Sequence, residues 1–345
     1  MDATLLERPA AGRTERLAWA DLLRVLATFA VILLHVSTTW LAMAEEGSAE
    51  WTALMIWDGL VRWCVPVFVL LSGAFLLDPD KPLTFRSLLR GHLPRILAAL
   101  LAWGFFYNLI YFRGSGAAGV RNALLLTLRG QTEYHLWYLY MLLGLYLLTP
   151  VLRGLVRGCS RRELEWLLAL WFLAGLLLPT LLTFFPSTGA YHWLQQLDIP
   201  LIRGYLGYYV AGYYLRTYGL RPRARYAVYA LGLAGLAATL ALGGDVYGYL
   251  TPNVACTACG LFLLCRQVFS SGRFRLDWAV VLSRYSFGIY LSHVLFIMVL
   301  SRLGLHTLRF TPLLSTPLLS LLVFFCAAVT ARALRKLPGV GAYIT

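Results

Sequence analysis

Residues 20–40 read ADLLRVLATFAVILLHVSTTW, and this stretch decides the fold class of the chain. It is apolar and long enough to cross a hydrocarbon core of about 30 Å, which requires about 20 residues of α-helix. It also contains three ionisable side chains, Asp21, Arg24 and His35. Each such group near a bilayer centre costs several kcal/mol unless it faces a bundle interior or a wet cavity. The stretch therefore predicts a membrane helix with one functional face.

The composition of the whole chain is that of a polytopic membrane protein. Of its 345 residues, 59% are hydrophobic and only 13% are charged, and the mean hydropathy is +0.68. These values lie far from those of soluble domains. We expect an all-α fold with about ten transmembrane helices, a tail over 1–16, one membrane domain over 17–335 and a second tail over 336–345. The predicted spans are residues 17–41, 52–77, 92–112, 134–152, 164–185, 200–217, 225–243, 249–270, 283–304 and 313–334.

The distribution of basic residues predicts the orientation of these spans. With the N-terminus inside and ten crossings, 22 of the 30 Lys and Arg residues fall in inner segments, four in outer segments and four within spans. Cytoplasmic loops carry the excess of Lys and Arg, so both ends are expected in the cytoplasm. The net charge of +14 then reports topology, and no nucleic-acid partner is predicted. We expect a multi-pass protein surrounded by lipids of the inner (cytoplasmic) membrane.

The ionisable residues of the first span share one helix face. From Arg24 to His35 the chain turns 1100°, within about 20° of a whole number of turns, and rises about 16 Å. Asp21 lies on the same face. Asp21 and Arg24 either form an ion pair that only aids insertion, or take part in function. His35, toward the outer side, is either bonded to a neighbouring helix or acts as a general base, since imidazole titrates near neutrality.

The second span repeats the pattern of charges inside an apolar helix. Asp58 and Arg62 are i,i+4 partners, Pro66 predicts a kink, and Ser72-Gly73 offers a small polar step for helix contact. Arg62 is expected about 13 Å from the outer end of its span, near the depth of His35. It either pairs with Asp58 alone or also holds an anionic group of a substrate.

Common motifs of soluble hydrolases are missing from the sequence. It contains no GxSxG, no HExxH and no P-loop. Cys256 and Cys259 form a CxxC inside an apolar helix without a second ligand pair, so no metal site is predicted. Aromatic clusters near the outer face, such as Tyr134 to Tyr140, form either an interfacial belt or a platform for sugars.

Four stretches, in this order, resemble the membrane acyltransferase-3 family over residues 16 to about 335. They are DLLR (21–24) with His35, Arg62 with VPVF (65–68) and LSG (71–73), HLWY (135–138) leading to Pro150, and SRYSFGIY (283–290) with His293. Within the family, residues 35–40 and the HLWY stretch are similar to enzymes that O-acetylate enterobacterial common antigen.

The resemblance implies ten helices around an internal pathway, with acyl-CoA, by family default acetyl-CoA, taken from the cytosol. The acyl group passes to a hydroxyl of a glycan or lipid-linked sugar at the outer side. Some members carry a fused extracytoplasmic domain that completes the transfer. Because this sequence ends after the tenth span, we expect it to finish the reaction itself or to use a separate extracytoplasmic acyltransferase partner.

Residue roles carried over from the family complete the prediction. His35 is the catalytic base, and Arg24 with Asp21 orients or balances charge along the acyl path. The substrate-binding candidates are Arg62, Ser72, His135, Trp137 and His293. Apart from the resemblance, guanidinium forks suit phosphates, so inner-face arginines either bind the CoA phosphates or serve only topology and lipid headgroups. The candidates are Arg90, Arg95 and Arg284.

Two other functions remain open from the sequence. In a transporter or flippase for a sugar or lipid intermediate, the buried charges would line a translocation path, and inverted repeats with broken helices would be expected. No clear repeat of that kind is present. A non-catalytic sensor or assembly factor is the third possibility. Consumption of acetyl-CoA by the solubilised protein separates an enzyme from both.

Overall fold

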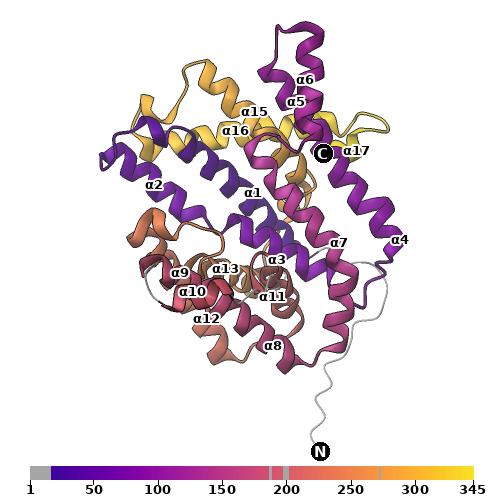
Figure 1. The fold of residues 1–345 in the computed structure, drawn as a ribbon, viewed down its shortest axis with the longest axis vertical. Coiled ribbons are helices and arrows are strands. Elements are labelled where there is room, and N and C mark those ends of the chain that lie inside the picture. Colours follow the sequence, from indigo (N-terminus) through magenta and orange to yellow (C-terminus); the bar gives the residue numbers. More distant parts are fainter. Residues whose placement is uncertain (1–16, 186–188, 197–201, 272) are drawn as a thin grey trace, which may run out of the picture.

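The computed structural model describes residues 17–185, 189–196, 202–271 and 273–345, so the predicted tail 1–16 lies outside the described residues. All regular elements in the described part are helices (Figure 1). The α-helices are α1 (Ala18–Thr39), α2 (Ala49–Val61), α3 (Cys64–Leu76), α4 (Phe85–Ser87), α5 (Leu93–Tyr111), α6 (Gly116–Leu128), α7 (Trp137–Gly158), α8 (Arg161–Leu170), α9 (Leu178–Phe184), α10 (Gly189–Gln196), α11 (Leu206–Thr217), α12 (Pro222–Leu242), α13 (Pro252–Phe269), α14 (Asp277–Ser283), α15 (Ser286–Arg302), α16 (Pro312–Leu334) and α17 (Gly341–Ile344).

Within the described residues, nine helical segments are long and apolar enough to cross a membrane. They begin at Ala18, Ala49, Phe85, Tyr134, Arg161, Pro222, Pro252, Ser286 and Pro312, and they match nine of the ten predicted spans. The expectation of an all-α polytopic membrane protein is confirmed.

The predicted span 200–217 is the exception, and residues 200 and 201 lie outside the described part. α11 fills its place with only 12 residues, about 18 Å of helix at 1.5 Å per residue. Gly204, with φ +98°, stands just before the helix and prevents an earlier start, because a helix needs negative φ. The Gly204 carbonyl accepts a hydrogen bond from the indole of Trp171, part-way along the span Arg161–Phe184, so α11 starts inside the membrane.

α11 runs parallel to α3 at very close range. A Cβ added to Gly73 would lie 1.8 Å from the Tyr209 carbonyl oxygen, and one added to Gly212 would lie 1.9 Å from that of Leu70. At the ends of the two helices, Arg216 Nη1 lies 2.9 Å from the Asp78 carboxylate. Small residues permit this approach, as is usual in membrane helix pairs.

α1 runs through the middle of the molecule and contacts α2, α3, α13, α14, α15 and α16 (Figure 1). Fifteen of its 22 residues are buried, which confirms that this span faces the bundle interior. The break between α2 and α3 falls at Arg62 and Trp63, one turn before Pro66. Proline causes such a break because it lacks an N–H and its ring clashes with the carbonyl four residues earlier.

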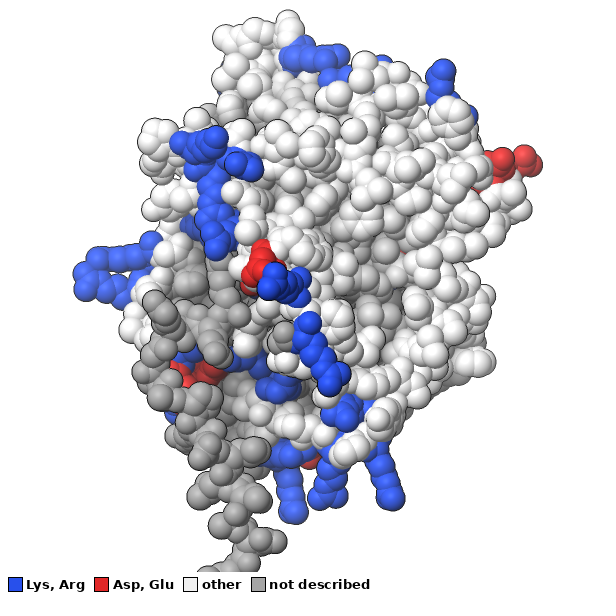
Figure 2. Space-filling model, turned by 180° about the vertical axis from the view of Figure 1, so that it is seen from behind, with Lys and Arg blue, Asp and Glu red and all other residues white. Residues whose placement is uncertain are grey.

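The outer surface of the bundle suits lipid. Figure 2 shows a broad area almost free of charged side chains over the right-hand part of this face, whereas most basic side chains lie on the left, near the centre and at the bottom. Leu321, Phe325 and Val329 of α16 form an exposed apolar stripe at four-residue spacing. Residues 336–345, predicted as a tail, include α17, whose chain packs back against α5.

Candidate functional site

Three histidines from distant parts of the chain meet toward the outer end of α1. The rings of His35 and His293 stack with centroids 5.2 Å apart, and those of His135 and His293 lie 5.1 Å apart, edge to face. His135 precedes α7 and His293 lies in α15; both are fully buried. The Tyr134 ring packs edge-on against His35 at 5.1 Å. Two of the predicted substrate-binding residues are thus beside the predicted base.

The hydrogen bonds of this histidine cluster leave ring nitrogens open. His293 Nδ1 lies 2.5 Å from the Tyr290 carbonyl oxygen, which only accepts, so Nδ1 carries the proton and Nε2 presents a lone pair. Within the described residues, neither His293 Nε2 nor either ring nitrogen of His135 has a hydrogen-bond partner. Unsatisfied buried polar atoms are costly and rare, and three in one place indicate a site for a hydroxyl-bearing ligand or water.

Below the histidines lies a small chamber of about 150 Å³. It extends from His35 and His135 down to Arg24 and Ser286, and the buried Ser286 hydroxyl has no hydrogen-bond partner among the described residues. The rest of its wall is apolar or aromatic: Val31, Leu34, Cys64, Val65, Phe68, Trp137, Tyr138, Leu142, Tyr249, Phe287 and Tyr290. The chamber can hold a short apolar group next to an imidazole.

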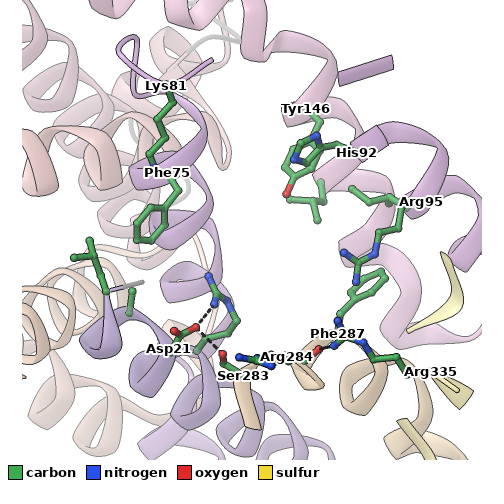
Figure 3. Close-up of a pocket in the computed structure, with 15 residues that line it drawn as sticks. Asp21, Phe75, Lys81, His92, Arg95, Tyr146, Ser283, Arg284, Phe287 and Arg335 are labelled. Carbon is green, nitrogen blue, oxygen red and sulfur yellow. Dashed lines mark hydrogen bonds and ion pairs between the residues drawn. The ribbon is translucent and has the colours of Figure 1, made fainter. Parts of the chain in front are cut away.

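A second, larger cavity of about 550 Å³ adjoins the chamber on the cytoplasmic side of the predicted topology (Figure 3). Arg24, Leu142 and Phe287 line both spaces. The basic residues around the larger cavity are Arg24, Lys81, His92, Arg95, Arg284 and Arg335, whereas Asp21 is the one carboxylate in the described wall. We call this space the basic cavity; its charge suits a ligand with several phosphates.

Asp21 and Lys81 are side chains of opposite charge in the wall of the basic cavity. Asp21 Oδ1 accepts hydrogen bonds from Arg24 Nη1 at 2.9 Å and from Ser283 Oγ at 2.5 Å (Figure 3), so it joins α1 to α14 and orients Arg24. Burial lowers the pKa of the Lys81 ammonium, and the nearby Arg216 guanidinium lowers it further.

Arg62 and Ser72 stand behind the chamber wall instead of lining it. Arg62 pairs with the buried Asp58, and its guanidinium lies over the rings of Tyr247 and Tyr249 at 5.0 and 5.9 Å. Ser72 Oγ donates to the Phe68 carbonyl at 2.8 Å. Each contacts a residue that does line the chamber: Arg62 contacts Tyr249, and Ser72 contacts Phe68.

The other four predicted binding residues differ in their access to the cavities. Trp137 does line the chamber, with its ring stacked on Tyr249 at 5.9 Å. Among the predicted phosphate-binding arginines, Arg95 and Arg284 line the basic cavity, whereas Arg90 is exposed outside it.

Several wall residues were missed by the sequence reasoning. Lys81 and Arg335 contributed only to the topology count, and the aromatic residues Tyr146 and Tyr249 were not separated from the many other aromatics. Ser286, Phe287 and Tyr290 belong to the SRYSFGIY stretch that carries the family resemblance, but the sequence analysis gave them no role in binding. No group of three potential metal ligands occurs in the part of the chain that the structure describes.

Comparison with known proteins identifies the family. The family model of an acyltransferase domain matches residues 17–332, which is nearly the whole chain. The chain belongs to the membrane acyltransferase-3 family. No curated protein and no solved structure shows significant similarity to it. As a member of this acyltransferase family, the chain is a multi-pass membrane acyltransferase that requires an acyl donor and an acceptor.

Proposed function

We propose that the protein is an O-acetyltransferase that moves an acetyl group from cytosolic acetyl-CoA to a hydroxyl of a cell-surface polysaccharide or lipid-linked sugar, in the inner membrane. One observation supports this most: the basic cavity and the apolar chamber meet at Arg24, and the chamber ends at His35. That arrangement suits a donor with a phosphate-rich end and a slender acyl-bearing end.

The donor is assigned to the two spaces by charge and size. Guanidiniums bind phosphates through paired, charge-assisted hydrogen bonds, so the nucleotide end of acetyl-CoA belongs in the basic cavity. The pantetheine arm then passes Arg24 into the chamber, whose volume of about 150 Å³ favours a short acyl group. Arg24 lies about 16 Å along α1 from His35 and acts on the donor arm. Asp21 is a positioning residue for Arg24.

His35 is proposed as the general base. It takes the proton of the acceptor hydroxyl as the hydroxyl oxygen attacks the thioester carbonyl. A C–O bond forms, the C–S bond breaks, and the proton passes to the departing CoA thiolate, so charge and atoms balance. The open nitrogens of His135 and His293 supply hydrogen bonds to hydroxyl groups of the acceptor.

The acceptor is assigned to the outer side of the histidine cluster. Trp137 and Tyr249 stack on each other in the chamber wall next to the cluster, and aromatic faces suit the C–H faces of sugars. Enterobacterial common antigen is the narrower acceptor suggested by residues 35–40 and 135–138. Transfer is direct, or passes through a separate extracytoplasmic acyltransferase.

The test combines cells and purified protein. Mass spectrometry of surface glycans and lipid-linked sugars, with and without the gene, should show the loss of an acetyl increment. Purified His35→Ala should keep its fold and its affinity for CoA but lose transfer from labelled acetyl-CoA. Retained transfer would refute the base assignment, and no consumption of acetyl-CoA by the unchanged protein would favour a transporter.

A further inference from the structure

The C-terminal turn of the described chain, Gly341–Thr345, packs against α5, the helix that places Arg95 in the wall of the basic cavity. Two side chains of α5 donate hydrogen bonds to the backbone of the turn: Trp103 Nε1 to the Ile344 carbonyl at 3.0 Å, and Arg95 Nη2 to the main-chain oxygen of Thr345 at 2.6 Å. Thr345 is itself buried, and its hydroxyl donates to the Gly341 carbonyl at 2.6 Å. The turn is therefore tied to α5 at two points.

The fit of this turn leaves no room for added atoms. A Cβ at Gly341 would lie 2.4 Å from the Leu334 carbonyl oxygen, a distance that real Cβ atoms do not show. A Cβ at Gly288 of α15 would lie 2.7 Å from Ala331 and 3.2 Å from Thr345. Glycine at both positions lets the turn, α15 and the end of α16 pack at this distance.

Arg95, which the turn holds, lines the basic cavity among other cations. Its guanidinium lies over the Phe287 ring at 5.2 Å, and Arg335 stands on the same wall with Nη1 bonded to the Arg284 carbonyl at 2.8 Å (Figure 3). Like charges at close range repel, so an unrestrained Arg95 side chain would swing away from Arg335. The main-chain oxygen of Thr345 uses one of the five N–H donors of Arg95 and leaves the others for a ligand.

We propose that residues Gly341–Thr345 form a C-terminal clasp that positions Arg95 for a phosphate group of the acyl-CoA donor; this rests on the donor assignment made above. The residues of the clasp are positioning residues, since they act through Arg95. A guanidinium that is already held in place loses less side-chain freedom on binding, and this advantage corresponds to roughly three- to tenfold in affinity.

The test measures binding of CoA itself by calorimetry, with the full chain in lipid nanodiscs, so that no turnover is needed. Gly341→Ala displaces the clasp, and Trp103→Phe removes the indole N–H while keeping a ring. Each should raise the Kd for CoA roughly three- to tenfold. Gly144→Ala is the matched control, because Gly144 is exposed on α7 with no atom within 4 Å of an added Cβ, and its Kd should not change.

A double-variant cycle separates positioning from a general structural effect. In an Arg95→Ala background, Gly341→Ala should add no further loss of affinity, because the residue through which the clasp acts is absent. A full further loss in that background, or an unchanged Kd in both clasp variants, would overturn the proposal. If the unchanged protein binds no CoA, the donor assignment itself is refuted, and the clasp proposal falls with it.

Discussion

The close packing of α3 against α11 at two glycines predicts how substitutions there change the stability of the protein. Gly73→Ala would place a Cβ 1.8 Å from the Tyr209 carbonyl oxygen, and Gly212→Ala would place one 1.9 Å from that of Leu70. Both contacts are with backbone atoms, which no side-chain rotation relieves. The two helices must therefore separate by at least about 1 Å, and overpacking of this kind costs about 1–3 kcal/mol.

This cost in the free energy of unfolding should appear as a lower unfolding midpoint. In a chain of this size, each kcal/mol moves the unfolding midpoint by about 2 °C, so either variant should lower the Tm by about 2–6 °C. The two contacts belong to one interface. Once one substitution has separated the helices, the second costs less, and the double variant should fall short of the sum.

Activity should fall with stability, because α11 supports the chamber. The Tyr208 hydroxyl of α11 donates to the Tyr249 carbonyl at 2.6 Å, and the Tyr249 side chain lines the chamber. A displaced α11 therefore moves part of the chamber wall, and transfer from acetyl-CoA should be slower in both variants.

The assay is thermal unfolding of the purified protein in detergent, followed by intrinsic fluorescence, with Gly144→Ala as the matched control. The control should unfold within about 1 °C of the unchanged protein, because exposed substitutions change stability little. An unchanged Tm in both Gly73→Ala and Gly212→Ala would refute the parallel close packing of α3 and α11.

Three further predictions concern the basic cavity and the histidine cluster. Arg335→Gln should raise the KM for acetyl-CoA about tenfold or more, because it removes a charge-assisted contact, whereas Arg90→Gln should leave the KM unchanged. Equal effects of the two substitutions in steady-state kinetics would argue against the basic cavity as the donor site. The lowered pKa of Lys81 means that its ammonium loses its charge at a lower pH than that of free lysine, so CoA affinity should weaken as the pH rises through that pKa. Lys81→Arg should flatten this dependence of the Kd for CoA on pH. An identical pH dependence in the variant would contradict the role of Lys81. His293→Asn keeps an N–H near the Tyr290 carbonyl but removes Nε2, so kcat should fall about tenfold or more with little change in Tm or in the Kd for CoA, and an unchanged kcat would exclude an acceptor contact at Nε2.

Local periodicity was sufficient to predict the face of the first span. Arg24 and His35 lie on one helix face by counting residues, and both line the chamber in the structure. The match of the family model to residues 17–332 confirms the resemblance drawn from four short stretches. The catalytic role of His35 stays a prediction.

Hydropathy alone did not predict the length of the sixth span. Residues 200–217 are apolar enough for a crossing, but α11 begins only at Leu206, after a glycine with positive φ. Apolarity reports where a segment can lie and says nothing about its backbone dihedrals.

The inner arginines show a second limit. The sequence analysis named both Arg90 and Arg95 as phosphate-binding candidates, but only Arg95 lines the basic cavity. The two lie five residues apart, which is about 140° on an ideal helix. Arg90 lies in the π-helical turn Leu88–His92 and Arg95 lies in α5, and the packing of α5 against α17 sets the direction of Arg95.

The sequence by itself determined the membrane class, most of the spans and the single polar face of the first helix, because hydropathy and helical periodicity are local properties of the chain. Only the tertiary structure decided that His135 and His293 meet His35, that Arg62 stands behind Tyr249, and that two cavities join at Arg24. These features depend on which helices pack together and in which rotation about their axes. That choice is made by contacts between residues far apart in the chain, such as the glycine contacts of α3 with α11, and no local pattern encodes it.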